Sequence, residues 1–347
     1  MKQQTFMKLI TIGLASVLLT GCTDEKSAEQ TAMDAVAAGD YDTAVSIASA
    51  AAEEGAADKD TFRARAIAML GLGQYDQAED SFIQALGCSN GIIDRTDIDN
   101  SYYLAVAQYK NGDHEEAKTT LDSIIALRPK DDGAYYMRGK VELAMGNKEA
   151  AISDFDSTVT LAPGNYDRYV GIYEQLHYYG YDTEAASYLE KAMSAGSKLS
   201  DYNKGVLEYY LGSYTEARND LENARKGGDS ENLSLYLGKT YEALGDEGYA
   251  MSIYEDYIRQ NSGAGRIYEQ LANCQIRKGD YESALTTIEA GLSLGNGEGE
   301  QSLMFDRIVA YERLYDFRSA KRYMDEYLSV FPDDEVARRE DVFLSSR

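Results

Sequence analysis

Two histidines and three cysteines are the side chains of this chain best suited to nucleophilic or metal chemistry. His114 and His177 lack the partners of such sites: no His-Glu-x-x-His and no paired cysteine spacing occurs. A phosphate-binding Gly-x4-Gly-Lys-Ser/Thr motif is absent too. The stretch RTDIDN, 95–100, clusters carboxylates without the glycine and final glutamate of a calcium loop, and we interpret it as a solvated acidic loop. The sequence therefore predicts no catalytic residue, metal or cofactor.

Cys22 is the exception, because its neighbourhood indicates covalent chemistry. Lys2 and Lys8 precede an apolar stretch, Leu9 to Leu19, that is too short to span a bilayer and typical of a signal-peptide core. The stretch ends in Leu-Thr-Gly-Cys, which resembles the bacterial lipoprotein box. The resemblance implies that residues 1–21 are a signal peptide, and that Cys22 becomes the mature N-terminus and carries acyl chains such as palmitate on a short linker, 22–24. The alternative is an ordinary signal peptide with a chance cysteine.

The charge balance disfavours two classes of binding partner. The chain has 34 Lys and Arg against 59 Asp and Glu, a net charge of −25, and loss of Lys2 and Lys8 would leave 32 against 59, or −27. Nucleic-acid phosphates and anionic lipid headgroups would repel so acidic a body. We therefore expect a protein that is held by its lipid on a cell membrane or outer envelope, outside the cytoplasm, and does not bind nucleic acid.

A repeat in the sequence predicts the helices that position the candidate side chains. A glycine is followed five residues later by an alanine at Gly39/Ala44, Gly73/Ala78, Gly112/Ala117, Gly146/Ala151, Gly180/Ala185, Gly212/Ala217, Gly245/Ala250 and Gly279/Ala284. A ninth copy has Tyr315 in place of the glycine, before Ala320. Steps near 34 residues indicate a solenoid. Apolar spacing on both sides predicts two helices per unit, with the glycine ending the first and a following Asp, Asn or Ser starting the second.

This pattern resembles the tetratricopeptide repeat, from about Glu25 to Pro332. One unit carries Leu237-Gly238, Tyr241, Ala250 and Tyr254 at the family's places, and another carries Tyr135, Gly139, Ala151, Phe155 and Pro163. No unit has the family's tryptophan. The resemblance implies an all-α, right-handed superhelical solenoid of about nine helix pairs over residues 25–332.

The ends and irregular steps carry further expectations. Residues 333–347 predict a short amphipathic helix that caps the last pair. Longer steps predict an extended connection within CSNGIIDRTDID and a flexible joint at Gly295 to Glu300. Cys88 and Cys274, 186 residues apart, form no disulfide framework, and we expect both to be unpaired, small buried hydrophobes.

The resemblance also implies where a partner binds. In this family the first helix of each pair lines the inside of the superhelix, and its inward positions bind peptides or proteins. Seven tyrosines fall at inward positions of four consecutive units, and the inward charges balance. The predicted partner-binding residues are Tyr102, Tyr109, Lys110, Tyr136, Lys140, His177, Tyr178, Tyr202, Tyr209 and Tyr210. Alternatively, some of these tyrosines only pack between neighbouring helices.

These observations favour a non-catalytic, lipid-anchored cell-envelope scaffold that binds a peptide or protein segment in a tyrosine-lined groove. One alternative is an assembly factor for a pilus or secretion-type surface complex, with a folded subunit as client. Another is an accessory subunit that activates a cell-wall enzyme. The sequence leaves the partner's identity and the membrane that carries the anchor open.

Overall fold

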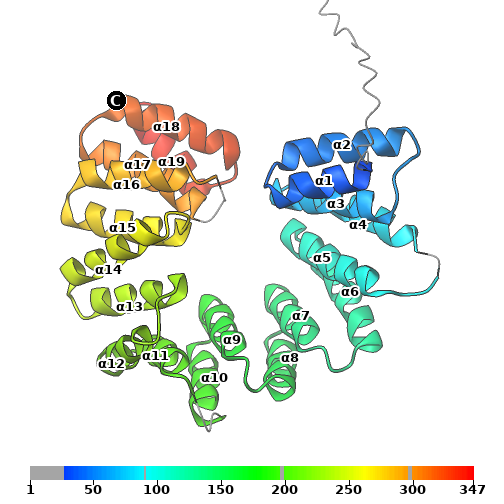
Figure 1. The fold of residues 1–347 in the computed structure, drawn as a ribbon, viewed down its shortest axis with the longest axis horizontal. Helices are drawn as coiled ribbons and strands as arrows, with labels where there is room; N and C mark the ends of the chain where they lie inside the picture. Colours follow the sequence, from blue (N-terminus) through cyan, green and yellow to red (C-terminus); the bar gives the residue numbers. More distant parts are fainter. Residues whose placement is uncertain (1–26, 90, 196–198, 296–298) are drawn as a thin grey trace, which may run out of the picture. The chain divides into compact units, whose positions relative to one another are not determined.

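The computed structural model describes residues 27–89, 91–195, 199–295 and 299–347. The predicted signal peptide and Cys22 lie outside these residues. The described ranges hold nineteen α-helices and no strand (Figure 1). None of these helices is both long and apolar enough to cross a membrane. The chain divides into two compact units, one up to Ile93 and one from Asp94 to Arg347.

Each unit is a series of antiparallel helix pairs. The first unit contains α1 (Ala28–Ala37), α2 (Tyr41–Glu53), α3 (Lys59–Gly71) and α4 (Tyr75–Gly87). The second contains α5 (Arg95–Asn111), α6 (His114–Leu127), α7 (Asp132–Ala144), α8 (Lys148–Leu161), α9 (Tyr166–Tyr178), α10 (Asp182–Ala195), α11 (Asp201–Tyr210), α12 (Tyr214–Arg225), α13 (Glu231–Ala243), α14 (Glu247–Gln260), α15 (Gly265–Lys278), α16 (Tyr281–Leu292), α17 (Glu300–Arg313), α18 (Phe317–Val330) and α19 (Glu335–Leu344). Nine pairs and a terminal helix confirm the predicted all-α repeat architecture.

The repeated glycines and alanines have the roles that their spacing predicts. All eight glycines lie between the two helices of a pair with φ between 72° and 93°, in the left-handed region that is open to residues without a Cβ. Tyr315, which replaces the ninth, has the only positive φ of a non-glycine residue in the described ranges, 60°. All nine repeat alanines are fully buried. Each helix pair is thus held together at a small side chain just after the turn.

A second set of glycines lets the helices of a pair approach each other. A Cβ on Gly139 of α7 would lie 2.5 Å from Cε1 of Phe155 on α8. A Cβ on Gly238 of α13 would lie 2.2 Å from Cε1 of Tyr254 on α14. Phe155 and Tyr254 are both fully buried, so the core of each pair is an aromatic ring packed on a bare stretch of backbone.

The start of the second helix agrees only partly with expectation. Asp40 and Asp280 accept hydrogen bonds from the backbone N–H of Thr43 and Ser283, as predicted for N-caps. Asp113, Asn147 and Ser213 occupy the same position but make no side-chain capping bond. Asn147 instead donates to the Glu142 carboxylate at 2.8 Å, so its side chain ties the turn to the first helix.

Two local expectations are wrong. The stretch 95–100 is the first part of α5 and not a solvated loop, because Asp94 and Asp97 form a capping box that starts the helix there. Asp97 and Asn100 are buried. Cys88 is exposed, since α4 ends at Gly87 and leaves it at the C-cap, whereas Cys274 is buried as expected. Cys88 and Cys274 are both unpaired in the described residues.

The C-terminal helix α19 packs against α18 through Ala337 and Leu344, which are both buried. Asp334 caps it by accepting from the N–H groups of Val336 and Ala337. Part of the predicted joint, 296–298, lies outside the described residues. A helix is therefore present where the sequence predicts a cap, with one face against the last pair.

Candidate partner-binding face

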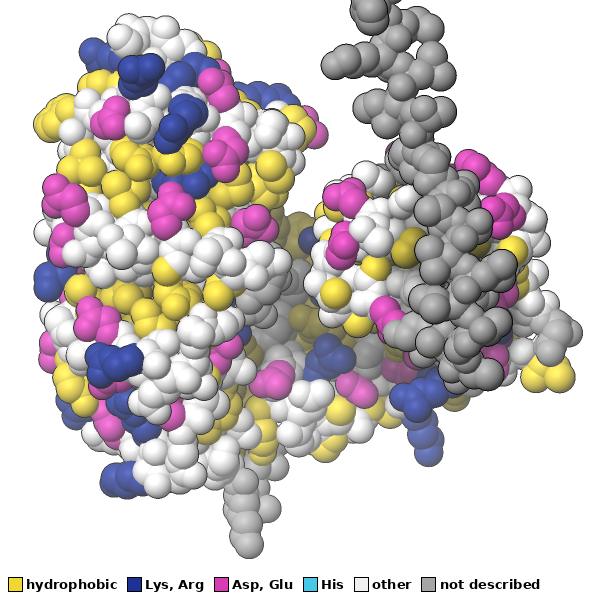
Figure 2. All heavy atoms as spheres, turned by 45° about the horizontal axis from the view of Figure 1, so that its top comes forward, with side chains coloured by type: hydrophobic (Ala, Val, Ile, Leu, Met, Phe, Trp, Pro, Cys, Tyr) yellow, Lys and Arg dark blue, Asp and Glu magenta, His cyan; other side chains and the backbone are white. Residues whose placement is uncertain are grey.

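In the second unit the first helices of the pairs form one continuous face. Each of α7, α9, α11, α13 and α15 contacts the first helix of the next pair. We call the surface of α5, α7, α9, α11 and α13 that carries the predicted tyrosines the tyrosine face. On the side of the molecule seen in Figure 2, acidic and basic side chains are interspersed and do not separate into fields of one sign.

One group on the tyrosine face joins α5, α7 and α9. The Lys140 ammonium on α7 lies 5.5 Å from the ring centroid of Tyr109 on α5 and 5.9 Å from that of Tyr136. The Arg168 guanidinium on α9 lies 4.6 Å from the Tyr136 centroid. The Tyr102 hydroxyl donates to Asp131, the N-cap of α7. Aromatic rings and cations therefore alternate from one helix pair to the next.

Lys140 is the electrostatically unusual member of this group. Burial lowers the pKa of its ammonium, and the positive charges of Lys110 and Arg168 lower it further. Arg168 has a carboxylate partner, Asp132, at 3.4 Å. Among the described residues no carboxylate lies within ion-pair distance of Lys140 or Lys110. The face therefore holds two unneutralised cations in a strongly acidic chain, one half-buried and one exposed.

A second group joins α9, α11 and α13 through tyrosine rings. Tyr210 lies 5.3 Å from Tyr173 and 5.9 Å from Tyr236, both measured between centroids and near edge-to-face. Tyr209 lies 5.8 Å from Tyr236 and also contacts Tyr214 of α12 at 5.7 Å. Edge-to-face pairs at these distances are favourable. Every ring in this group is half-buried, so each ring packs against its neighbours and is also partly accessible to solvent.

Hydrogen bonds fix this second group. The Tyr210 hydroxyl donates to the Glu174 carboxylate and lies 3.1 Å from the Tyr236 hydroxyl. Burial first, then the charge of Tyr236, raises the pKa of Tyr210 well above its usual value. Burial likewise raises the pKa of Tyr202 to about 12. The phenols therefore remain neutral hydrogen-bonding groups at any physiological pH.

His177 and Tyr178 lie at the end of α9 and are the most open of the predicted residues. The His177 ring is stacked on Tyr173, with centroids 5.6 Å apart and planes 7° apart, and its Nδ1 lies 2.6 Å from Asp182 Oδ1. Tyr178 is 81% exposed, and among the aromatic rings of the described residues its ring pairs with that of Tyr179. His177 is thus oriented by an aromatic and a carboxylate, whereas Tyr178 is free to meet a partner.

The structure brings most of the predicted residues together, in two groups. Tyr102, Tyr109, Tyr136 and Lys140 form the first, beside Lys110, and Tyr209 and Tyr210 belong to the second, with Tyr202 on the same helix and His177 stacked on its Tyr173. Tyr178 belongs to neither group but packs on Tyr179, which hydrogen-bonds to Tyr109 of the first group. Sequence reasoning missed Arg168, Tyr173 and Tyr236, which occupy positions beside the inward ones, and Tyr214, which begins the second helix α12. An aromatic residue or an arginine directly next to an inward position would have indicated Arg168, Tyr173 and Tyr236.

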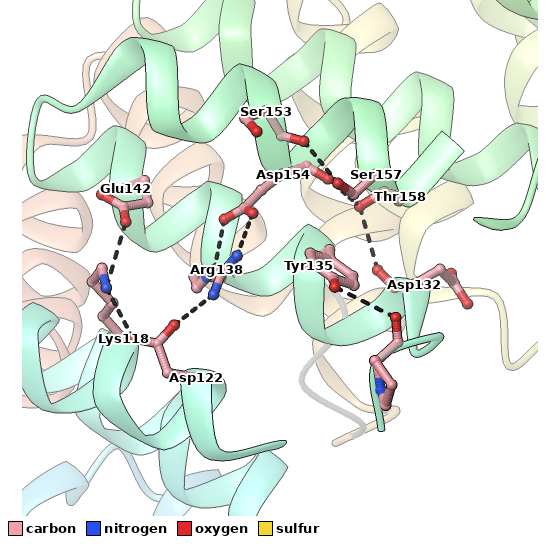
Figure 3. Close-up of polar contacts among 11 residues, drawn as sticks. Lys118, Asp122, Asp132, Tyr135, Arg138, Glu142, Ser153, Asp154, Ser157 and Thr158 are labelled. Atoms are coloured by element: carbon pink, nitrogen blue, oxygen red, sulfur yellow. Dashed lines mark hydrogen bonds and ion pairs between the residues drawn. The ribbon is translucent and has the colours of Figure 1, made fainter. Parts of the chain in front are cut away.

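On the side of α7 opposite to the tyrosine face, ion pairs join this helix to α6 and α8. Arg138 and Lys140 are two residues apart and point to nearly opposite sides of the helix. Arg138 binds Asp154 of α8 at 2.6 and 2.8 Å and Asp122 of α6 at 2.5 Å (Figure 3). Asp122 also accepts from Lys118 at 2.9 Å. Burial pushes the pKa of Asp122 up, but the hydrogen bonds from Lys118 and Arg138 outweigh it and leave the pKa below its usual value.

No cluster of three metal-ligating side chains occurs in the part of the chain that the structure describes. The stretch 87–91 reads Gly-x-Ser-x-Gly, the pattern of a nucleophile elbow. It follows a helix and not a strand, and Ser89 donates to the carbonyl of Ile92 at 3.4 Å. The side chains of the tyrosine face are suited to holding a ligand by ring stacking, charge and hydrogen bonds.

Sequence and structure comparisons agree with the repeat. Tetratricopeptide-repeat family models match residues 102–166 and 265–294. The chain is 36% identical over 62 residues to FK506-binding protein 59 of Drosophila melanogaster, covering 18% of this chain and 14% of that protein. It is 23% identical over 253 residues to tetratricopeptide repeat protein 21B of Mus musculus, covering 70% of this chain and 17% of that one. The chain thus spans less than a fifth of either relative.

A solved tetratricopeptide repeat protein from Parabacteroides merdae is 16% identical, with a TM-score of 0.47, over 83% of this chain and 99% of that one. The structure of YrrB, described as a TPR protein with an unusual peptide-binding site, is 17% identical with a TM-score of 0.36, over 63% of this chain and 96% of that one. Nine helix pairs, their glycine turns and the two family-model matches lead to one conclusion: the described chain is an all-α array of helix pairs that matches the tetratricopeptide repeat at residues 102–166 and 265–294.

Proposed function

We propose that the protein is a non-catalytic scaffold, anchored to the cell envelope by lipid on Cys22, that binds a peptide or protein partner on the tyrosine face. Tetratricopeptide arrays are scaffolds for protein–protein interaction, and this is the coarse function of the fold. The finer proposal is carried by one observation. Lys140 is a half-buried cation without a carboxylate partner in the described chain, held between the rings of Tyr109 and Tyr136.

The chemistry of that arrangement favours a particular ligand. A half-buried ammonium without a counter-ion is costly, and a carboxylate on a partner would neutralise it. The adjacent rings offer broad apolar faces at low entropic cost, and their hydroxyls can meet backbone carbonyls of an extended chain. The partner segment is therefore expected to carry a carboxylate next to apolar or aromatic side chains.

Site-specific photo-crosslinking tests where the partner binds. A photoreactive phenylalanine analogue replaces Tyr178, which is 81% exposed on the tyrosine face, or Tyr249, which is 42% exposed on the second helix α14. The account expects irradiation of intact cells to yield one discrete adduct from position 178 and none of that mass from position 249. Equal adducts from both positions, or none from position 178, would contradict it.

The lipid anchor is tested separately. Replacing Cys22 with Ser removes the sulfur that would carry the acyl chains. The variant is expected to remain as uncleaved precursor or to leave the membrane fraction. If the Cys22→Ser protein fractionates and migrates like the wild type, the lipoprotein part of the proposal is wrong, while the crosslinking result still decides the binding part.

A further inference from the structure

Two neighbouring hollows lie at the C-terminal end of the second unit, away from the tyrosine face. The larger, about 480 Å³, lies between α17, α18 and α19, and the smaller, about 380 Å³, lies between α15, α17, α18 and α19. Phe305 of α17 and Val336 of α19 line both, so the two form one groove along α17. Figure 2 shows hydrophobic side chains at the surface of these last pairs, with charged side chains around them.

The larger hollow is mostly apolar. Its apolar lining consists of Phe305, Ile308, Val309, Phe317, Val336 and Phe343. Val336 is 55% exposed and Phe343 is 38% exposed, although both lie on the helix that covers the last pair. The capping helix therefore leaves an apolar strip open beside α17, which is a feature of recognition surfaces.

Two carboxyl groups along this strip each have one oxygen that makes no hydrogen bond among the described residues. Glu312 of α17 has an oxygen, Oε1, that is shielded from solvent and has no hydrogen-bond partner among the described residues. Its carboxyl faces that of Glu340 on α19. In the smaller hollow Oδ2 of Asp306 is likewise shielded and has no hydrogen-bond partner among the described residues, and the negative charge of Glu269 on α15 acts on it. Buried carboxyl oxygens without donors are costly, so a ligand that donates to them would be favoured.

The charges that line the groove are mainly negative. The larger hollow has Glu312, Glu340 and Arg313, and α18 contributes only Phe317. The smaller has Asp306 and Asp334, and its described lining includes no cation. Arg313 is exposed and forms no ion pair within the described residues. A cationic side chain on the ligand would therefore meet complementary charge, and the net charge of the whole chain would attract it.

We propose that this groove binds a segment of a partner protein in which a lysine or arginine is flanked by apolar side chains. The apolar side chains fill the strip from Phe305 to Phe343, and the cation donates to Glu312 and Glu340. The site goes beyond the proposed function, because it is separate from the tyrosine face and selects the opposite charge. A failure at either site leaves the other untouched.

Because binding is linked to deprotonation of the groove carboxyl groups, the affinity should depend on pH, which packing alone would not cause. Burial, and then the charge of Glu340, raises the pKa of Glu312 to about 7, with Arg313 the only opposing charge. Burial and Glu269 raise the pKa of Asp306 to about 6. A bound cation favours the ionised carboxylate, so binding displaces a proton when the pH is below these values. The affinity is therefore expected to rise about tenfold between pH 6 and pH 8, the effect of one proton with a pKa near 7.

The test uses the full chain and two labelled, end-blocked peptides. One has the sequence Leu-Arg-Leu-Leu-Arg-Leu, and the other has citrulline, the neutral isostere, in place of each arginine. Fluorescence anisotropy gives Kd at pH 6 and pH 8. We expect the arginine peptide to bind at least tenfold more tightly than the citrulline peptide at pH 8. Equal binding of the two peptides, or no binding of either, would overturn the proposal.

Matched variants on one helix localise the binding. Glu340→Gln is expected to weaken binding of the arginine peptide at least fivefold at pH 8 and to remove most of its pH dependence. Glu335→Gln changes an exposed carboxyl outside the groove and is expected to leave Kd within twofold. Val336→Ser should weaken binding at least fivefold, whereas Val342→Ser, 72% exposed and outside the lining, should not. If the control variants weaken binding as much as their partners, the peptide binds elsewhere and the proposal is wrong.

Discussion

The ammonium nitrogen of Lys140 lies 5.5 Å from the centroid of the Tyr109 ring, which belongs to the preceding helix pair. The contact links two repeats, and the charges of Lys110 and Arg168, which lower the pKa of Lys140, are also positive. A protein selected only for stability would gain by replacing this lysine. Its presence is best explained by a partner that supplies the missing negative charge.

Replacing Lys140 with Met should therefore separate stability from binding. The ring contacts, near the 6 Å limit for cation–π attraction, are weaker than the cost of half-burying an unpaired charge. We expect the free energy of unfolding at pH 7 to rise by up to about 1 kcal/mol, discounted for partial exposure. Partner capture should fall. Urea unfolding and one binding assay measure the two.

The pH dependence follows from the lowered pKa. Below the folded-state pKa, Lys140 is charged in both states and the folded chain bears the full cost. As the pH rises toward the unfolded value, near 10.4, the lysine loses its proton in the folded state first and the cost disappears. The stability gain of Lys140→Met should therefore shrink between pH 7 and pH 10. Lys110→Met, at an exposed site, should change stability little. An unchanged gain at pH 10 would contradict the electrostatic explanation.

The close contact between the helices of a pair makes a second prediction. Gly238→Ala would place a Cβ 2.2 Å from Tyr254, and Gly139→Ala would place one 2.5 Å from Phe155. Both rings are fully buried and cannot move freely, so each change should cost about 1–3 kcal/mol in unfolding free energy. Gly87→Ala is the matched control, because a Cβ there meets nothing within 4 Å. It should leave stability unchanged or raise it by up to about 1 kcal/mol. Equal losses at all three sites would refute this explanation of the core.

The ion pairs of Arg138 lead to a third prediction. Arg138→Met leaves Asp154, which is 5% exposed, without its two hydrogen bonds, and the loss should be about 3 kcal/mol. Arg259→Met removes an exposed pair with Asp256 and should cost less than about 1 kcal/mol. Because the pKa of Asp122 is lowered in the folded state, its stabilising contribution is full above about pH 4 and is lost as the pH falls through the folded value. Urea titrations at pH 7 and pH 3 should therefore show the wild type losing part of its advantage over Arg138→Met in acid. An advantage that persists unchanged at pH 3 would be evidence against the ion pairs.

The repeat, the turns and the core were all predictable from sequence because each rests on a single residue type. The turn needs a residue without a Cβ, the close contact needs an alanine, and both recur at fixed spacing. Tyr315 shows the limit of that reasoning. Its place in the pattern was evident, and it does take the left-handed conformation that eight glycines take elsewhere, at a cost of about 1–2 kcal/mol.

The tyrosine face was only partly predictable. Which side chains meet across two pairs depends on how one pair is rotated against the next, and Arg168 and Tyr236 reach the face from positions that the repeat pattern does not mark. The spacing places Phe305, Glu312 and Arg313 of the groove beside α19 at inward positions, but it does not predict that the carboxyl groups there are partly buried. Cys88 and the stretch 95–100 were misjudged for a related reason: the helix ends at 87 and 95 depend on caps that are specific to one connection.

The most direct test of the central claim compares three tyrosine variants by melting temperature and partner capture. Tyr109 and Tyr209 are half-buried on the tyrosine face, whereas Tyr254 is fully buried and bonds to Glu242 at 2.6 Å. Tyr109→Ala and Tyr209→Ala should weaken partner capture by about 1–3 kcal/mol and lower the melting temperature only slightly. Tyr254→Ala should lose about 3–5 kcal/mol of unfolding free energy. If Tyr109→Ala and Tyr209→Ala instead lower the melting temperature as much as Tyr254→Ala and leave partner capture unchanged, these tyrosines serve packing alone and the tyrosine face is not a binding site.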